Sequence, residues 1–405
     1  MLEPTSAILA ENPQRIEPAL FDDALPAAIA DAATELSAAA AVLGATLHPR
    51  SANSLADLVR IMNAYYSNLI EGHNTRPRDI ARALAGDFDR DEGRRNLQAE
   101  AVSHVRVQEA LDRHAAQGIR SEPASTAFIA ALHRAFYDRV PAAMLHITNG
   151  ERTYEMIPGA WRSDDMHDVV VGRHQPPASR YVRDFMDYFA WRYRFESLGK
   201  AARIVALAAA HHRLNYIHPF PDGNGRVSRL MSHAMAHEAG IGAHGLWSVS
   251  RGLARGLGDR SQYKRMMDFA DTPRESDLDG RGNLSRRALI EFILWFLRVC
   301  LDQVTFMSGL FDLNQLPRRL RSYAQNHTSL EFGAARLLEE AAVRGEFERG
   351  DTSTILGKPE RSARRVLKSV VDAGLLASNT PKGPVSLRFT IESAEALFPN
   401  LFAAG

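Results

Sequence analysis

The stretch IHPFPDGNGRVSRLM, residues 217–231, restricts the fold more than any other part of the chain, because it requires a loop between two helices. Its two prolines cannot continue a helix, so the helix that precedes them must end near Tyr216. Gly223 and Gly225 let the backbone turn tightly and direct its amides inward, and a new helix is expected to begin near Arg226. A glycine-rich loop that leads into a helix N-terminus is a typical site for a phosphate group.

The polar side chains of this stretch suit chemistry on phosphates. Arg226 and Arg229 lie three residues apart, so both project from one side of the helix and could grip phosphate oxygens. Asp222 offers the hard oxygen that Mg²⁺ prefers, and His218 titrates near neutrality and could act as a general base. The set favours transfer of a phosphorus-containing group to a hydroxyl. The stretch lacks the G-x-x-x-x-G-K-S/T pattern, which excludes a P-loop.

Apolar residues recur at three- and four-residue spacing over most of the chain, which predicts a mainly helical protein. Residues 152–177 differ, because short β-type pieces, turn residues and a closing Pro-Pro indicate a hairpin with a loop exit. The formal net charge is +1 over 405 residues, so no overall field favours nucleic acid or an anionic membrane. The single cysteine fits a reducing compartment and no signal peptide is evident, so we expect a cytoplasmic protein without a membrane span.

The composition changes after residue ~310, a boundary good to a few residues. Two helices joined by LGKPE, followed by two strands separated by NTPKG, predict a winged helix-turn-helix. The alternative to DNA binding is a protein-docking or dimer module with a solvated basic face. The second helix carries four basic residues that could contact DNA phosphates: Arg361, Arg364, Arg365 and Lys368.

The motif HPFPDGNGR, residues 218–226, resembles the signature of the Fic-domain family, His-Pro-Phe-x-Asp/Glu-Gly-Asn-Gly-Arg, and fills every fixed position. The resemblance covers roughly residues 120–310. It implies a helical core that transfers AMP from ATP to a target-protein hydroxyl, by attack on the α-phosphate with pyrophosphate leaving. Doc-type kinases of the same fold have Lys where this chain has Gly225, which argues against that branch.

The same resemblance implies residue roles. His218 would deprotonate the target hydroxyl, Asp222 would hold Mg²⁺, and Phe220 would anchor the loop in the core. Residues 152–177 would be the family's flap, which holds a target segment by strand-like pairing. The backbone from Gly223 to Gly225 would supply an anion hole, and the two arginines would grip the β- and γ-phosphates. The implied ATP-binding set is Phe220, Gly223, Asn224, Gly225, Arg226, Arg229 and, beside the adenine, Tyr263.

Residues 67–72, SNLIEG, end a predicted helix at about 52–72 with an acid, where the helix dipole would favour a cation. Fic proteins of one class carry an inhibitory helix with the pattern Ser/Thr-x-x-x-Glu-Gly/Asn before the core, and SNLIEG fills each fixed position. The resemblance implies that Ser67 and Glu71 are inhibitory, that Glu71 pairs with Arg229, and that the pair obstructs the γ-phosphate. The simpler interpretation is a helix end with a solvated glutamate.

Two histidine patterns remain. His211, His212 and His218 are not expected to share a metal, because adjacent histidines point to different helix faces. His233 and His237 lie four apart, but the segment HAMAHE does not match H-E-x-x-H, so both are predicted to be ordinary helix residues.

We therefore expect a mainly α protein: an N-terminal helical region with the inhibitory helix (1–115), a Fic core with a β-hairpin flap (116–312) and an α+β winged helix (313–405). The expected function is adenylylation of a Ser, Thr or Tyr hydroxyl on a target protein, with ATP as substrate and Mg²⁺ as cofactor, restrained by Glu71. The family resemblance also implies a homodimer. Three alternatives stay open: removal of AMP from a modified target, another nucleotide or a phosphocholine donor, and a DNA-binding regulator with a weak Fic site.

Overall fold

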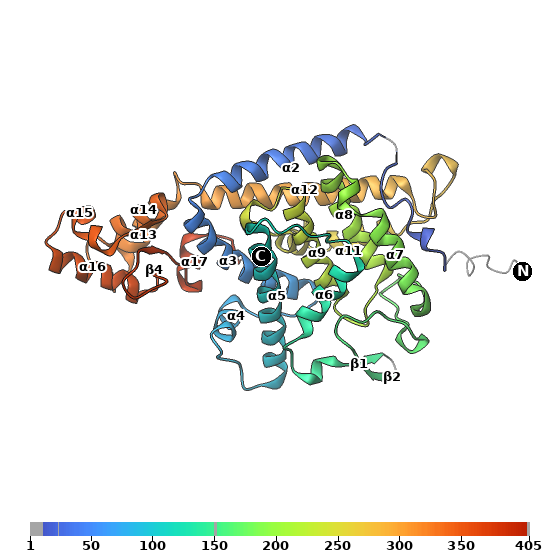
Figure 1. The fold of residues 1–405 in the computed structure, drawn as a ribbon, viewed down its shortest axis with the longest axis horizontal. Coiled ribbons are helices and arrows are strands. Elements are labelled where there is room, and N and C mark those ends of the chain that lie inside the picture. Colours follow the sequence, from blue (N-terminus) through green and yellow to red (C-terminus); the bar gives the residue numbers. More distant parts are fainter. Residues whose placement is uncertain (1–10, 23, 150–151, 403–405) are drawn as a thin grey trace, which may run out of the picture.

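The computed structural model describes residues 11–22, 24–149 and 152–402, and these are mainly helical (Figure 1). The predicted helical class is therefore confirmed. Before the loop at 218–223 the chain forms α2 (Ala27–Ala45), α3 (Pro49–Ile70), α4 (Pro77–Leu84), α5 (Glu92–Ala116), α6 (Thr126–Tyr137), α7 (Val182–Arg192) and α8 (Lys200–Ile217). After it come α9 (Asn224–Glu238), α10 (Val249–Arg255), α11 (Gln262–Ala270) and α12 (Arg286–Phe311).

Helices α8 and α9 pack against each other in the middle of the molecule, and the loop between them carries the sequence motif. Helix α9 also contacts α5 and α6, while α12 packs on α8 and runs along α2 (Figure 1). Of the described helices, only α2 is long and apolar enough to cross a membrane by length and composition. Its inward face, including Ile29, Leu36 and Leu43, is buried, and the helix lies on α12.

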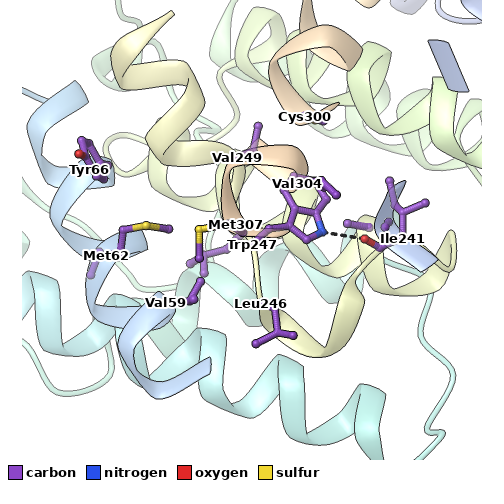
Figure 2. Packing of buried hydrophobic residues seen from close by; sticks show 14 of the residues in the cluster. Val59, Met62, Tyr66, Ile241, Leu246, Trp247, Val249, Cys300, Val304 and Met307 are labelled. Carbon is purple, nitrogen blue, oxygen red and sulfur yellow. Dashed lines mark hydrogen bonds between the residues drawn. The ribbon is translucent and has the colours of Figure 1, made fainter. Parts of the chain in front are cut away.

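Helix α3 is fixed by an apolar core that it shares with α12 and the segment before α10. Figure 2 shows Val59 and Met62 of α3 near Trp247, with Met307 of α12 close by. These four side chains are at most 3% exposed, and the indole N–H of Trp247 donates to the Ile241 carbonyl at 2.7 Å. Burying a side chain of this size contributes about 1.5–3 kcal/mol, so this face of α3 holds the helix firmly against the core.

The hairpin lies earlier than the predicted 152–177. Strand β1 (His146–Asn149) pairs antiparallel with β2 (Arg152–Glu155), with Thr148 opposite Thr153. The prediction therefore placed only the second strand correctly. Residues 156–177 are irregular, with a 3₁₀ turn at Asp165–His167 and an isolated bridge, because the turn residues and Pro-Pro that suggested a hairpin instead prevent a second ladder.

The C-terminal part begins after a break in helicity at 312–315. It contains the helix pair and the two strands expected there, and adds a third strand, a helix at its start and a last helix that were not predicted. The three strands form an antiparallel sheet in the order β3-β5-β4. The elements of the C-terminal part are α13 (Leu316–Asn326), α14 (Ala334–Arg344), β3 (Glu346–Phe347), α15 (Thr352–Leu356), α16 (Glu360–Asp372), β4 (Leu376–Ala377), β5 (Val385–Leu387) and α17 (Ile391–Leu397).

Candidate active site

The loop between α8 and α9 has the backbone that its sequence requires. Helix α8 ends at Ile217, and His218 adopts a left-handed conformation with φ 51°. Helix α9 begins at Asn224, just after Gly223, which has φ 79°. A Cβ at Gly223 would also approach the Tyr137 hydroxyl oxygen to 2.7 Å. Glycine is therefore required here both by backbone conformation and by close packing.

Two residues of the motif hold the loop in shape. The Asn224 side chain accepts a hydrogen bond from the Phe220 amide (2.9 Å) and donates to the Phe220 carbonyl (2.8 Å). The Phe220 ring is fully buried and stacks on His133 at 3.8 Å between ring centroids. Phe220 thus anchors the loop in the core, as predicted. The Asn224 side chain closes the loop, so only the backbone amide of Asn224 remains for an anion.

His218 is uncharged near neutral pH. Burial, with the positive charge of Arg162 and the nearby His174, lowers the pKa of His218 to about 3. The imidazole is therefore neutral near pH 7, and a neutral ring has one nitrogen lone pair for a general base. The left-handed backbone at His218 turns this residue out of the helix that precedes it.

Arg162 is a residue that the sequence analysis missed. Its side chain is fully buried and donates to the carbonyls of His218 (2.7 Å) and Ile217 (3.2 Å), which end α8. It also donates to the Ser179 hydroxyl and the Pro177 carbonyl. Arg162 thus ties the irregular segment after the hairpin to the backbone of the candidate base. A lone arginine in a stretch without periodicity gave no signal of this role.

Asp222 and Arg226 face each other at the start of α9. The Arg226 guanidinium lies 3.0 Å from both Asp222 carboxylate oxygens and also pairs with Glu100 of α5. The Tyr137 hydroxyl donates to the second Asp222 oxygen at 2.9 Å. Burial raises the pKa of Asp222, and the negative charge of Glu71 adds to the effect. One partly exposed carboxylate next to an anion site fits Mg²⁺, which usually takes one or two carboxylates and completes its shell with phosphates and water.

Helix α3 places its last turn directly over the start of α9. Helix α3 ends at Ile70, and Glu71 follows it as the C-terminal cap. The Glu71 carboxylate lies 2.5 Å from the Arg229 guanidinium. The Ser67 hydroxyl accepts from Arg229 Nε at 2.9 Å, and the Ser67 carbonyl accepts at 3.3 Å. The structure thus places Ser67 and Glu71 in contact with Arg229, and the predicted pairing of Glu71 with Arg229 is present.

The Glu71 carboxylate also lies against the N-terminus of α9. A Cβ built on Gly225 would meet Glu71 Oε1 at 2.5 Å, so the carboxylate lies against the first turn of α9. Burial alone would raise the pKa of Glu71, but the guanidinium groups of Arg229 and Arg226 outweigh it and lower the pKa. An ionised carboxylate therefore lies at this helix N-terminus beside a buried arginine, a place that favours negative charge.

Tyr263 has a role in the core. Its side chain is largely buried, and its hydroxyl lies 2.8 Å from His211 Nε2, whose other ring nitrogen lies 2.9 Å from the Ser232 hydroxyl. His212 instead contacts Asp271 at 3.1 Å, so the two neighbouring histidines have different partners. Contact between Tyr263 and adenine stays a prediction.

The basic helix of the C-terminal part is largely neutralised by carboxylates. Arg364 pairs with Glu360, Lys368 pairs with Asp372, and the third basic residue, Arg365, pairs with Glu331 on another segment. Partnered side chains offer less charge to DNA phosphates than the sequence suggested. This arrangement does not favour the DNA-binding alternative.

Comparison with known proteins identifies the central part of the chain. A model of the Fic/DOC family matches residues 123–236, which include the hairpin, α8, the motif loop and most of α9. The chain contains a Fic domain. The match is shorter than the predicted core at 116–312, whose boundaries stay a prediction.

Curated relatives of the Fic domain agree over a short segment. The chain is 36% identical over 74 residues to the protein adenylyltransferase Fic of Drosophila virilis, and 38% identical over 72 residues to that of Drosophila grimshawi. Each match covers 18% of this chain and 15% of the relative. The whole-chain fold also resembles a Fic family protein from Desulfovibrio desulfuricans G20, with TM-score 0.50 and 17% identity over 91% of this chain and 98% of that one.

Proposed function

We propose that the Fic domain transfers AMP from ATP to a hydroxyl of a target protein, and that Glu71 restrains this reaction. The observation that carries the proposal is the position of the Glu71 carboxylate, held by Arg229 against the first turn of α9. This is where the phosphates of a nucleotide would bind a helix N-terminus. A carboxylate that competes for the same arginine lowers productive nucleotide binding without unfolding the site.

The residues at the loop suit each part of this reaction. Neutral His218 accepts the proton of the attacking hydroxyl, whose oxygen forms a bond to the α-phosphorus. The bond from that phosphorus to the bridging oxygen breaks, and pyrophosphate leaves. Backbone amides at the start of α9 and the Arg229 guanidinium stabilise the charge on the phosphates. A Mg²⁺ ion held by Asp222 would neutralise part of that charge.

The hairpin is the proposed place for the target segment. Strands β1 and β2 form a two-stranded sheet, and an added strand from the target would extend it by main-chain hydrogen bonds. Arg162 connects the segment after this hairpin to the His218 carbonyl. A target bound at the hairpin would therefore lie near the candidate base.

The test compares two variants by intact-protein mass spectrometry after incubation with ATP and Mg²⁺. Glu71→Gly should gain the mass of AMP residues by self-modification, and Glu71→Gly/His218→Ala should not. Equal modification of both variants would show that His218 is not the base and would refute the mechanism. Parallel incubations with other nucleoside triphosphates and with CDP-choline test the choice of donor.

The opposite reaction, removal of AMP, is tested in the same system. Modified Glu71→Gly protein is incubated with unmodified wild type, and free AMP is measured. The proposal predicts no AMP release above a His218→Ala control. Release by the wild type would instead assign Glu71 to the positioning of water.

A further inference from the structure

A cluster of three side chains lies at the end of α9 that is far from the motif loop. His233 and His237 of α9 and Asp112 of α5 meet there. His233 Nε2 lies 2.6 Å from Asp112 Oδ1, His237 Nε2 lies 2.9 Å from the same oxygen, and the two ring nitrogens are 3.2 Å apart. Of the residues that the structure describes, only this group brings three such side chains to within metal-binding reach. The prediction that the two histidines are ordinary helix residues therefore missed their shared partner.

These three atoms, His233 Nε2, His237 Nε2 and Asp112 Oδ1, form a triangle, and hydrogen bonds cannot satisfy all three of its contacts at once. If both histidines donate from Nε2 to Asp112 Oδ1, their two N–H groups also face each other across 3.2 Å. If one histidine instead presents a lone pair at Nε2, that lone pair faces the carboxylate oxygen. One edge is unfavourable in either case. A cation on the triangle would contact all three donor atoms and remove the conflict.

We propose that Asp112, His233 and His237 bind one divalent transition-metal ion of the Zn²⁺ type. Imidazole nitrogens with a carboxylate are typical ligands for such ions. The three ligand atoms are 2.6–3.2 Å apart. If an ion lay 2.0–2.1 Å from each of them, the ligand–ion–ligand angles would be about 80–100°. Such angles place three ligands on one face of the ion and leave positions for water on the other.

The surroundings support three ligands of this kind. Arg60 Nε donates to the second Asp112 oxygen at 2.7 Å, which orients the carboxylate and leaves Oδ1 for the ion. A Cβ on Gly242 would overlap the His237 ring, and a Cβ on Gly245 would approach the Asp112 carboxylate to 3.0 Å. The turn that covers the cluster therefore depends on two glycines.

The cluster is reachable from the outside. A cavity of about 1180 Å³ between α2, α3, α5 and the turn at 242–244 is lined by Asp112 and His237. It gives an ion and its water ligands a path from the outside.

The test titrates tag-free, metal-depleted full-length protein with CoCl₂ and follows the visible absorption of bound Co²⁺. The proposal predicts one equivalent per chain, displaced by ZnCl₂. His237→Gln and Asp112→Asn should each weaken binding at least about tenfold. His244→Gln changes an exposed histidine that lines the same cavity and should bind as the wild type does.

A second readout keeps the test independent of spectroscopy. ZnCl₂ should raise the melting temperature of the wild type and of His244→Gln, and should leave that of the folded Asp112→Asn variant unchanged. The proposal is overturned if the wild type binds no stoichiometric Co²⁺, or if folded His237→Gln or Asp112→Asn binds as tightly as the wild type. Neither readout requires nucleotide, so the outcome is separate from that of the proposed AMP transfer.

Discussion

Removing the contacts that hold Arg229 one at a time should release the proposed reaction in a graded series. The expected order of self-adenylylation rate is Glu71→Gly, then Glu71→Gln, then Ser67→Ala, then wild type. Glycine removes the competing carboxylate altogether, whereas glutamine keeps its shape and loses only the charge. Ser67→Ala removes the hydroxyl that accepts from Arg229 Nε and leaves the carboxylate in place.

The structure sets the size of each step. The Glu71–Arg229 contact joins a guanidinium that is 1% exposed to a carboxylate that is 30% exposed, at 2.5 Å. A hydrogen bond between charged groups contributes about 1.5–3 kcal/mol, so its loss should raise activity by roughly ten- to a hundredfold. The Ser67 hydroxyl contributes about 0.5–1.5 kcal/mol, which corresponds to roughly two- to tenfold. The apolar face of α3 is untouched in every variant, so the helix should stay in place.

The assay measures initial rates of AMP incorporation and, separately, the Kd for ATP. Gln117→Gly is the matched control, because Gln117 caps α5 with φ −82° and ψ −1° and precedes a glycine, as Glu71 (φ −77°, ψ −1°) does in α3. It removes a side chain from the same kind of helix end without touching the site. An equal rise in Gln117→Gly, or no rise in Glu71→Gly, would refute the inhibitory role of Glu71.

Three further predictions concern other residues. Arg162→Lys loses most of the bonds to the end of α8 and should lower kcat in the Glu71→Gly background more than it changes KM for ATP, because it misplaces His218. Gly223→Ala forces a side chain into a left-handed residue against Tyr137 and should lower the free energy of unfolding by more than about 1 kcal/mol in a urea titration. Burial lowers the pKa of His104 from 6.5 to about 3. As the pH falls, the unfolded chain therefore takes up a proton on this histidine before the folded chain does. The free energy of unfolding should fall as the pH drops below about 6.5. His104→Leu should make that fall less steep in denaturant titrations at pH 4 to 7.

The parts of the site that the sequence predicted are set by local backbone rules or by a complete motif. Prolines and glycines in HPFPDGNG leave few conformations, so the end of α8, the loop and the start of α9 lie where expected. The partnership of Glu71 with Arg229 spans the fold, and only the resemblance of SNLIEG to an inhibitory motif made it predictable. The observed ion pair gives that acid at a helix end a cationic partner.

The parts that were missed depend on contacts between distant segments. Glu100 and Asp112 lie on α5, far in sequence from the α9 residues that they contact, and no local pattern marks either one. Arg162 lies in an irregular segment, where periodicity gives no information. Strand β3 is two residues long and depends on pairing with β5, so a propensity-based reading could not find it.

The most direct measurement of the central claim follows the fate of each phosphate of ATP. Folded Glu71→Gly protein is incubated with Mg²⁺ and with ATP labelled at either the α- or the γ-phosphate. We expect the α label to become covalently attached to protein, the γ label to appear in pyrophosphate, and both to stay in ATP with Glu71→Gly/His218→Ala. Attachment of the γ label, or the absence of α label on protein that binds ATP, would contradict transfer of AMP by this site.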